Sequence, residues 1–398
     1  RNSGAGQRAY NHAIQLSKKG YNVHLISESP NGKNLLKKFR ALKNSQIVDI
    51  SINYDAEMDR GIKKKIKFIK CIPSIIFQLH KFMRRNKYDF DIVHGFTTSI
   101  LYYCTVVLVK FFSKNVKCIT EVTAMSPAGM IYLDSKSLLK IAKYNMYKYA
   151  FVCLDKVVTS SPANTKNYNK FVDPTENSIL ITNGIHLKKF VPLKPNEKFV
   201  LRKNFDLHQK ELIILYIGAI IDNQKRVGYF NDIISDLGKN RILTNITFIF
   251  AGNFDRTQSH LNIYNSILET SAKYNNIETK FLGHVTNVID YINISDIAIF
   301  PSESEGLPNS VIECMACGVP VIMNQIDGVS DFIIDHRKDS FLAKNGDVKS
   351  YTNIIYELNS DNDYYSRISK SAREKIKEKF SENDIFDRYL NLYNEFLV

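Results

Sequence analysis

The sequence lacks the features that mark several classes of protein. No apolar run approaches the ~20 residues that span a bilayer, since the longest, residues 99–109, is closed by Lys110. Six cysteines scattered over 398 residues are too few for a disulfide framework. The chain opens without the basic and then apolar pattern of a secretory signal. We therefore expect a cytoplasmic protein with no transmembrane segment.

Acidic residues are scarce in the first half of the chain. Residues 1–195 carry 32 Lys or Arg against 12 Asp or Glu, whereas residues 196–398 carry 22 against 28. Residues 60–88 hold ten basic residues, no acidic one and many apolar side chains. That pattern is typical of a helix on an anionic membrane surface, and equally of a solvated helix face. We disfavour nucleic acid as a partner because no recognisable binding motif accompanies the charge.

Short apolar runs alternate with helical patterns in two successive series. A polar stretch with two prolines, residues 191–198, separates them and is the best linker candidate. Two such series predict an α/β protein with two doubly wound parallel sheets. We expect an N-terminal domain over 1–190, a second domain over 191–380, and a helix over 381–398 that crosses back to the first domain. The predicted strands are 23–26, 91–94, 117–122, 156–160, 178–182, 212–217, 246–251, 279–283, 297–300, 320–323 and 340–343.

A glycine loop stands near the start of the chain. Ser3-Gly4-Ala5-Gly6 runs into a helical pattern, and Gly20 ends that pattern. A glycine loop that opens a helix normally follows a strand, and none precedes Gly4. The pattern therefore predicts that the first domain begins one strand earlier.

The most informative stretch follows the apolar run 297–300. A loop carrying Glu305 leads to a helix that Asn309 or Ser310 can cap, with Glu313 about one turn inside it. In open parallel sheets ligands bind beyond the carboxyl ends of the strands, and a helix N-terminus suits phosphate. Two carboxylates beside such a site suit hydroxyl-bearing groups on either side of a diphosphate.

These residues resemble the retaining family 4 glycosyltransferases, which have the GT-B fold of two Rossmann-like domains facing a cleft. The E-x7-E motif of that family lies within a longer pattern, matched here by Ser302-x-x-Glu-Gly-Leu-Pro-Asn-Ser-x-x-Glu-x-Met-Ala-x-Gly-Val-Pro-Val321. The resemblance implies that Glu305 acts in catalysis by contacting the hydroxyls of the donor sugar, and that Glu313 binds the nucleotide ribose. It also implies that the backbone of Gly306, Leu307, Pro308 and Asn309 receives the diphosphate.

Other stretches resemble the same family in the same order. Tyr-Ile-Gly218 followed by Lys225 resembles the first strand and loop of the nucleotide-binding domain, whose lysine meets the donor phosphates in catalysis. The turn that ends at Val285 resembles the one whose backbone reads the base. Gly4 and Gly6 resemble the glycine loop of the acceptor-binding domain.

The sequence also departs from the family pattern. Ala219 stands where the family has an arginine, and Arg226 is the candidate substitute. The family usually places a histidine near the reacting carbon, after the strand predicted at 117–122, and none stands there. Glu121 and Thr123 lie nearby in the sequence, but we assign neither a role.

Taken together, the residues and the resemblance predict transfer of a sugar from a nucleotide-sugar donor to an acceptor hydroxyl, with retention of the anomeric configuration. The expected acceptor is a lipid-linked or surface glycan precursor, and the expected place is the inner face of a bacterial membrane. We expect no metal or other cofactor, and Cys314-x-x-Cys317, which has no second pair, is interpreted as core packing. Two alternatives stay open, a GT-B protein that binds a nucleotide sugar without transfer and a sugar-nucleotide 2-epimerase. A nucleic-acid-binding protein and a nicotinamide dehydrogenase rank behind them.

Overall fold

The computed structural model divides the chain into two compact units, which are described separately. Unit 1 comprises residues 1–159, 165–180 and 389–398, and unit 2 comprises residues 160–164 and 181–388. The predicted domain boundaries stay predictions. Most of the basic segment 60–88 and the residues after the strand at 117–122 lie outside the described residues. The structure describes residues 4–27, 45–49, 77, 80, 81, 84, 85, 90–96, 109–113, 115–122, 151–172, 177–207, 211–240, 242–253 and 257–397.

The described part of unit 2 is built on one parallel sheet of six strands in the order β12-β11-β10-β7-β8-β9. This is the doubly wound arrangement, with the first strand of the unit, β7, next to its fourth, β10. The strands are β7 (Leu212–Ile217), β8 (Ile246–Ala251), β9 (Ile277–Gly283), β10 (Ile297–Phe300), β11 (Val321–Asn324) and β12 (Phe341–Ala343).

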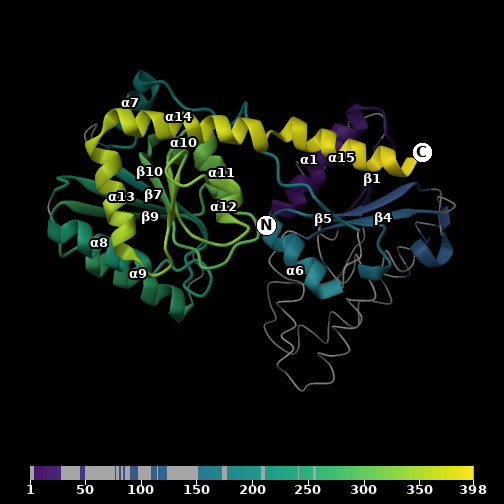
Figure 1. Ribbon diagram of the computed structural model, residues 1–398, viewed down its shortest axis with the longest axis horizontal. Coiled ribbons are helices and arrows are strands. Elements are labelled where there is room, and N and C mark those ends of the chain that lie inside the picture. The colour runs from purple at the N-terminus through teal and green to yellow at the C-terminus, as the bar shows by residue number, and fades with distance from the viewer. Residues whose placement is uncertain are drawn as a thin grey trace, which may run out of the picture. The chain divides into compact units, whose positions relative to one another are not determined.

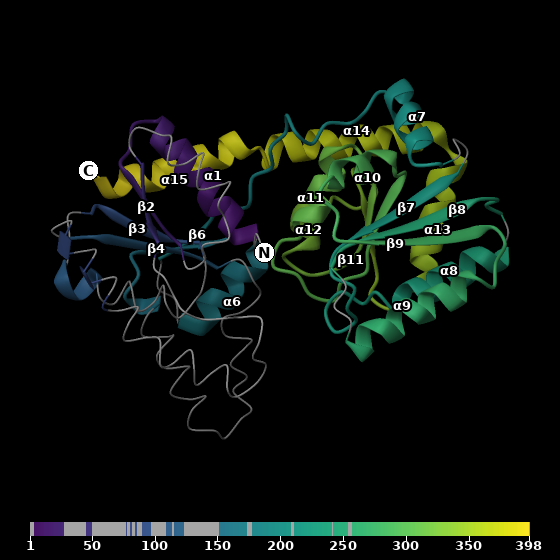
Figure 2. The same cartoon turned by 180° about the vertical axis from the view of Figure 1, so that it is seen from behind.

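Helices cover both faces of this sheet, with α8 and α9 on one face and α10 and α11 on the other (Figures 1 and 2). The strands are apolar at nearly every position because both faces are buried. Ile214, Tyr216 and Phe248 pack in the core that also contains the apolar stripes of α8 and α13. The helices are α7 (Pro195–Asn204), α8 (Tyr229–Asn240), α9 (Gln258–Ser271), α10 (Val288–Ile294), α11 (Asn309–Ala316), α12 (Ser330–Ile333), α13 (Val348–Ser360), α14 (Asn362–Lys379) and α15 (Glu382–Leu397).

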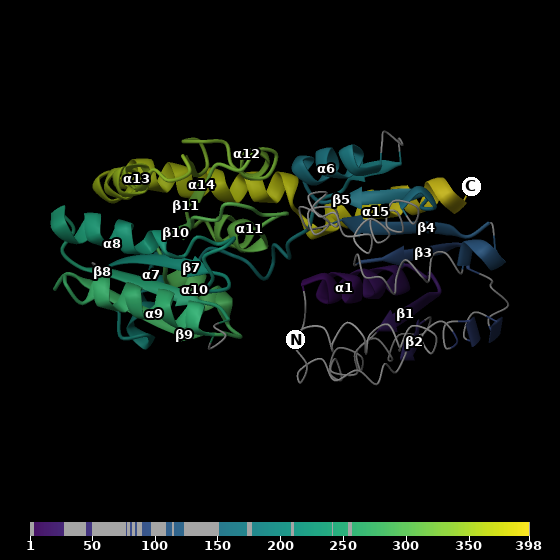
Figure 3. The ribbon, with the colours of Figure 1, turned by 90° about the horizontal axis from the view of Figure 1, so that it is seen from below.

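The described part of unit 1 holds a four-stranded parallel sheet in the order β3-β4-β5-β6 and a parallel pair, β1-β2. Strands β3, β4 and β5 lie side by side in Figure 3. Helix α1 and the end of α15 lie above this sheet and α6 lies below it (Figure 1). The elements are α1 (Gly4–Lys18), β1 (Val23–Ser27), β2 (Ser45–Asp49), β3 (Ile92–Gly95), β4 (Lys117–Val122), β5 (Lys156–Thr159), α6 (Pro162–Val172) and β6 (Ser178–Leu180).

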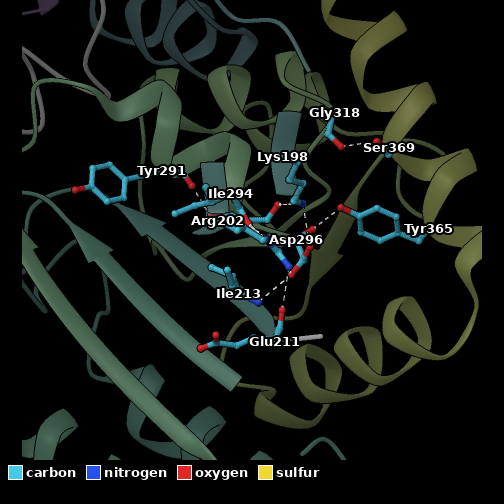
Figure 4. Close-up of polar contacts among 11 residues, drawn as sticks. Lys198, Arg202, Glu211, Ile213, Tyr291, Ile294, Asp296, Gly318, Tyr365 and Ser369 are labelled. Atoms are coloured by element: carbon cyan, nitrogen blue, oxygen red, sulfur yellow. Dashed lines mark hydrogen bonds and ion pairs between the residues drawn. The ribbon is translucent and has the colours of Figure 1, made fainter. Parts of the chain in front are cut away.

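A network around Asp296 holds the amino ends of β7 and β10 together (Figure 4). Its carboxylate pairs with Lys198 at 3.0 Å and with Arg202 at 2.6 Å, and it accepts a hydrogen bond from the N–H of Ile213. The guanidinium of Arg202 also donates to the carbonyls of Ile294 and Glu211. Burial opposes ionisation of Asp296, but these partners outweigh it and lower its pKa. The network therefore fixes α7 to the edge of the sheet where the strands begin.

Most predicted elements are confirmed within one or two residues. The helix that Gly20 ends is α1, and Gly20 has the left-handed φ of +95° that a glycine adopts readily. The sequence pattern missed the strand at 45–49, and the linker candidate 191–198 is only partly irregular because α7 begins at Pro195. Proline suits that first helical position, where no N–H is needed.

Candidate functional site

The candidate site lies where the order of the sheet reverses, between β7 and β10. Loops at the carboxyl ends of these two neighbouring strands hold Lys225 and Glu305. The Nζ atom of Lys225 lies 2.5 Å from an Oε1 of Glu305, which is almost fully buried. Open α/β sheets bind ligands at such a reversal. The structure therefore brings together the two residues predicted to act in catalysis.

Three further contacts join the same two loops. The guanidinium of Arg226 pairs with a carboxylate oxygen of Glu303 at 2.5 Å. The side chain of Gln224 donates to the carbonyl of Ser304, and the backbone carbonyl of Gln224 accepts from the N–H of Glu303. Arg226 therefore faces Glu303 in this structure, and its predicted contact with the donor stays a prediction.

Helix α11 begins at the edge of the same site with open backbone donors. Pro308 is its N-cap, so the prediction that Asn309 or Ser310 caps the helix is wrong. The side chain of Asn309 instead pairs with Asn183 at 2.8 Å. Among the described residues, none accepts a hydrogen bond from the backbone N–H of Gly306, Leu307, Asn309 or Ser310. These donors, together with the positive end of the helix dipole, suit an anion.

Glu313 lies one turn into α11, and its surroundings do not fully compensate the cost of burying its negative charge. Burial raises its pKa from 4.5 to about 7, and the charge of Lys189 only partly opposes this. No described residue donates a hydrogen bond to its carboxylate. A carboxyl group in that state is suited to accept hydrogen bonds from ligand hydroxyls.

Glycines let the neighbouring loops approach one another closely. A Cβ atom on Gly252 would lie 1.7 Å from the carbonyl oxygen of Gly218, and the N–H of Gly252 donates to the carbonyl of Gly283. Gly283 itself has a left-handed φ of +66°. Beneath Gly218, the buried hydroxyl of Tyr216 donates to the carbonyl of Ala219. The loops after β7, β8 and β9 thus form a continuous edge that also carries the predicted base-reading position, Val285.

Cysteine chemistry is not part of this site. Cys314 and Cys317 are buried free thiols, which confirms their interpretation as core packing. Burial raises the pKa of both thiols, to about 12 for Cys317, so neither is a ready nucleophile or metal ligand. In the part of the chain that the structure describes, no three His, Cys, Asp or Glu side chains are placed to hold a metal ion.

Unit 1 contains a buried polar cluster that the sequence did not reveal. The carboxylate of Glu121, at the end of β4, accepts from the hydroxyl of Tyr389 at 2.6 Å and pairs with Arg8 at 3.0 Å. The hydroxyl of Tyr393 lies within hydrogen-bond distance of His12 and His94. Burial raises the pKa of Glu121 and lowers that of His12 to about 3. The cluster binds the end of α15 to α1 and the sheet, and the partners come from segments too distant in sequence for any local pattern to reveal.

The predicted glycine loop of unit 1 is already helical. Gly4 and Gly6 lie in the first turn of α1, so the expectation of a loop at these positions is wrong. Their predicted role toward an acceptor or a phosphate stays a prediction.

The comparisons with known proteins place this site in a family. Residues 211–361 match the family model described as "Glycosyl transferases group 1", and they include β7, Lys225, Glu305 and α11. This segment is a group 1 glycosyltransferase domain. The chain resembles a UDP-Gal:alpha-D-GlcNAc-diphosphoundecaprenol alpha-1,3-galactosyltransferase of Escherichia coli, at 24% identity over 84% of this chain and 82% of that protein.

Further similarities agree with this assignment. An N,N'-diacetylbacillosaminyl-diphospho-undecaprenol alpha-1,3-N-acetylgalactosaminyltransferase of Campylobacter jejuni is 24% identical over 67% of this chain and 68% of its own length. A glycosyltransferase of Rickettsia africae has a similar structure, with a TM-score of 0.75, 22% identity and coverage of 100% of this chain and 96% of that chain. The fold is GT-B, with a parallel sheet in each unit, and the protein is an enzyme of the glycosyltransferase class. Among the described residues, no helix has the length and hydrophobicity needed to cross a membrane.

Proposed function

We propose that this glycosyltransferase moves a sugar from a nucleotide-sugar donor to a hydroxyl of a lipid-linked glycan precursor, with retention of the anomeric configuration. The observation that carries the proposal is the meeting of Lys225, Glu305 and the open N-terminus of α11 at the reversal of the sheet. A cation and free N–H donors suit a diphosphate, and the adjacent carboxylate suits sugar hydroxyls.

The chemical need for this arrangement lies in the leaving group. As the anomeric C–O bond breaks, negative charge develops on the departing nucleoside diphosphate. The N–H groups of Gly306, Leu307 and Asn309, with the ammonium of Lys225, would stabilise that charge as it forms. Since the chain supplies these donors itself, we expect transfer without a metal ion. Glu305 would orient the sugar for attack by the acceptor, and Glu313 would hold the nucleotide ribose.

The names of the relatives support the choice of acceptor. The relative from Escherichia coli acts on a diphosphoundecaprenol-linked sugar, and so does the one from Campylobacter jejuni. An acceptor of that kind places the reaction at a membrane surface. The excess of basic residues in the first half of the chain suits an anionic surface.

The test is a transfer assay with the purified chain. It combines labelled UDP-glucose, UDP-galactose, UDP-N-acetylglucosamine or GDP-mannose with a synthetic undecaprenyl-diphosphate N-acetylglucosamine acceptor. We expect labelled lipid product even when EDTA removes divalent metal ions. The NMR coupling constant of the anomeric proton should show that the product has the same anomeric configuration as the donor. An inverted product would contradict retention. Donor binding without transfer to this or to other lipid-linked sugars would favour the binding protein that we kept as an alternative.

We further propose that unit 1 docks on anionic membrane through its basic segment, residues 60–88, and the helical turn at 109–112, whose Phe112 contacts His80 of that segment. Phe111 is 78% exposed and Phe112 is 46% exposed, and the ring of Phe112 lies 5.1 Å from that of His80. Exposed aromatic rings and exposed basic side chains together suit an interface with anionic lipid. Lys81, Arg84 and Arg85, which follow His80 in the sequence, are exposed.

Co-sedimentation with vesicles tests this docking. We expect binding to phosphatidylglycerol vesicles, weakened about tenfold by the double substitution Phe111→Ser with Phe112→Ser because apolar burial is lost. The control is Phe199→Ser, which changes a 45% exposed phenylalanine in unit 2. Equal binding to phosphatidylcholine and phosphatidylglycerol, or an equal effect of the control, would contradict the docking surface.

A further inference from the structure

Arg226 has a backbone conformation that an arginine seldom adopts. Its φ is +49°, in the left-handed region that favours glycine. The loop is held in this shape by local hydrogen bonds, in which the N–H of Arg226 donates to the carbonyl of Asp222 and the Asp222 side chain accepts from Gly228. Glycine would adopt this backbone more readily, so any advantage of arginine here lies in the contacts that its side chain makes.

The contacts of Arg226 and its neighbours join two loops of the site. Three consecutive residues, 224–226, each contact the facing segment 303–305. The central pair, Lys225 with Glu305, is largely buried, whereas Arg226 and Glu303 are 37% and 42% exposed. An exposed ion pair adds little to stability.

We propose that Arg226 and Glu303 are positioning residues: their ion pair holds the lysine loop against the glutamate loop so that Lys225 and Glu305 face the donor together. The inference rests on the proposed function and deepens it, because it assigns to Arg226 a role through Lys225 rather than a contact with the donor. Displacing a binding group by about 1 Å weakens every interaction that the group makes with the ligand.

The chain supplies a matched control. Arg337 also has a left-handed φ, of +62°, and its guanidinium pairs with Glu357 in a two-pronged contact of 2.8 to 3.0 Å. Both side chains are well exposed, as in the Arg226 pair. Arg337 lies just before β12, at the amino ends of the strands and so at the opposite edge of the sheet, and its partner Glu357 lies in α13.

The experiment is calorimetry of donor binding with UDP-glucose, UDP-N-acetylglucosamine, GDP-mannose and ADP-glucose. We expect Arg226→Glu and Glu303→Arg each to weaken the best donor about tenfold, and the two together to restore affinity to within about threefold of wild type. The exchanged control pair, Arg337→Glu with Glu357→Arg, should leave affinity unchanged. Arg226→Gly should keep the thermal midpoint and lose affinity, which a purely structural role would not produce.

The outcomes separate this inference from the function on which it rests. An exchanged pair as weak as Arg226→Glu alone would show that the arginine contacts the donor, and would overturn the positioning role. Unchanged affinity in both single variants would overturn it too. In either case a wild type that binds a donor leaves the proposed function standing. A folded wild type that binds none of the four would contradict the function and the inference together.

Discussion

The two edges of the six-stranded sheet differ in how completely their carboxylates are paired with cations and hydrogen-bond donors. At the edge where the strands begin, Asp296 is surrounded by Lys198, Arg202 and the N–H of Ile213, and its pKa is lowered. At the edge where they end, burial raises the pKa of Glu313 to about 7, and backbone donors of α11 have no acceptor among the described residues. At one edge the buried charge has its partners, and at the other several polar groups have no partner among the described residues.

We propose that this difference separates residues that stabilise the fold from residues that contact the donor. A buried charge with all its partners contributes to the fold, and removing one partner is costly. A carboxyl whose burial is only partly compensated costs stability, which makes Glu313 a candidate for a functional role. The comparison can be tested by substitutions at each edge, from the largest expected effect to the smallest.

The largest effect is expected from Asp296→Asn. The substitution leaves Arg202, whose side chain is 6% exposed, without its counter-charge. The free energy of unfolding should fall by about 3–5 kcal/mol in urea titrations at pH 7. Because the pKa of Asp296 is lowered on folding, its contribution is present at neutral pH and should be lost as pH falls below about 4.

A second substitution keeps this prediction testable. Arg202→Met added to Asp296→Asn removes the unpaired cation and should recover much of the loss. Donor affinity of the folded double variant should equal that of wild type, since the network lies at the edge away from the site. A loss smaller than about 1 kcal/mol in Asp296→Asn would contradict the structural role of the network.

The next effect is expected from Lys225→Met at the other edge. Loss of a charge-assisted contact with phosphate should weaken donor binding about 10- to 100-fold, as measured by calorimetry. Stability should fall by about 1–2 kcal/mol because Glu305 is left buried without its cation. Adding Glu305→Gln should recover stability and not affinity. Lys239→Ala, an exposed lysine of α8, is the control and should change neither.

A smaller effect is expected from Glu313→Gln, and it depends on pH. The folded state raises the pKa of Glu313 to about 7, so it favours the protonated form and loses stability as pH rises from about 4.5 through 7. The glutamine variant has no such penalty. It should gain about 1–2 kcal/mol over wild type at pH 8 and nothing at pH 4. If the unfolding free energies of wild type and Glu313→Gln changed with pH in parallel, the folded state would not raise the pKa of Glu313, and the prediction would be wrong.

The smallest effect is expected from a surface pair. Lys349 contacts Asp236 at 2.5 Å, but its side chain is 68% exposed. Lys349→Ala should change the unfolding free energy by no more than about 0.5 kcal/mol. A loss as large as that of Asp296→Asn would show that burial is not what distinguishes the network around Asp296.

The sequence predicted the sheet of unit 2 well because each strand is a short apolar run bounded by polar residues. It also located the Glu305 loop and α11, since a strand, a glycine-containing loop and a helix start follow one another in a single segment. It missed β2, whose residues 45–49 alternate weakly and have no clear turn signal. It also misplaced the cap of α11, because an asparagine near a helix start pairs with Asn183 from another segment instead.

The contacts that define the site depend on tertiary structure. Nothing local predicts that Glu303 meets Arg226, or that Tyr389 reaches Glu121 across 268 positions of the chain. Those pairings follow from strand order, which places the loops after β7 and β10 side by side. The assignment of Lys225 rested on resemblance, and its contact with Glu305 is what gives it a physical basis.

Calorimetry on edge-specific variants tests the central claim most directly. The four nucleotide sugars are titrated into wild type, Lys225→Met, Glu313→Ala and the double variant Asp296→Asn with Arg202→Met. The account predicts saturable binding of at least one donor, weakened about tenfold or more in the first two variants and unchanged in the third. No binding to folded wild type, or equal weakening by changes at both edges, would contradict a donor site at the carboxyl ends of the strands.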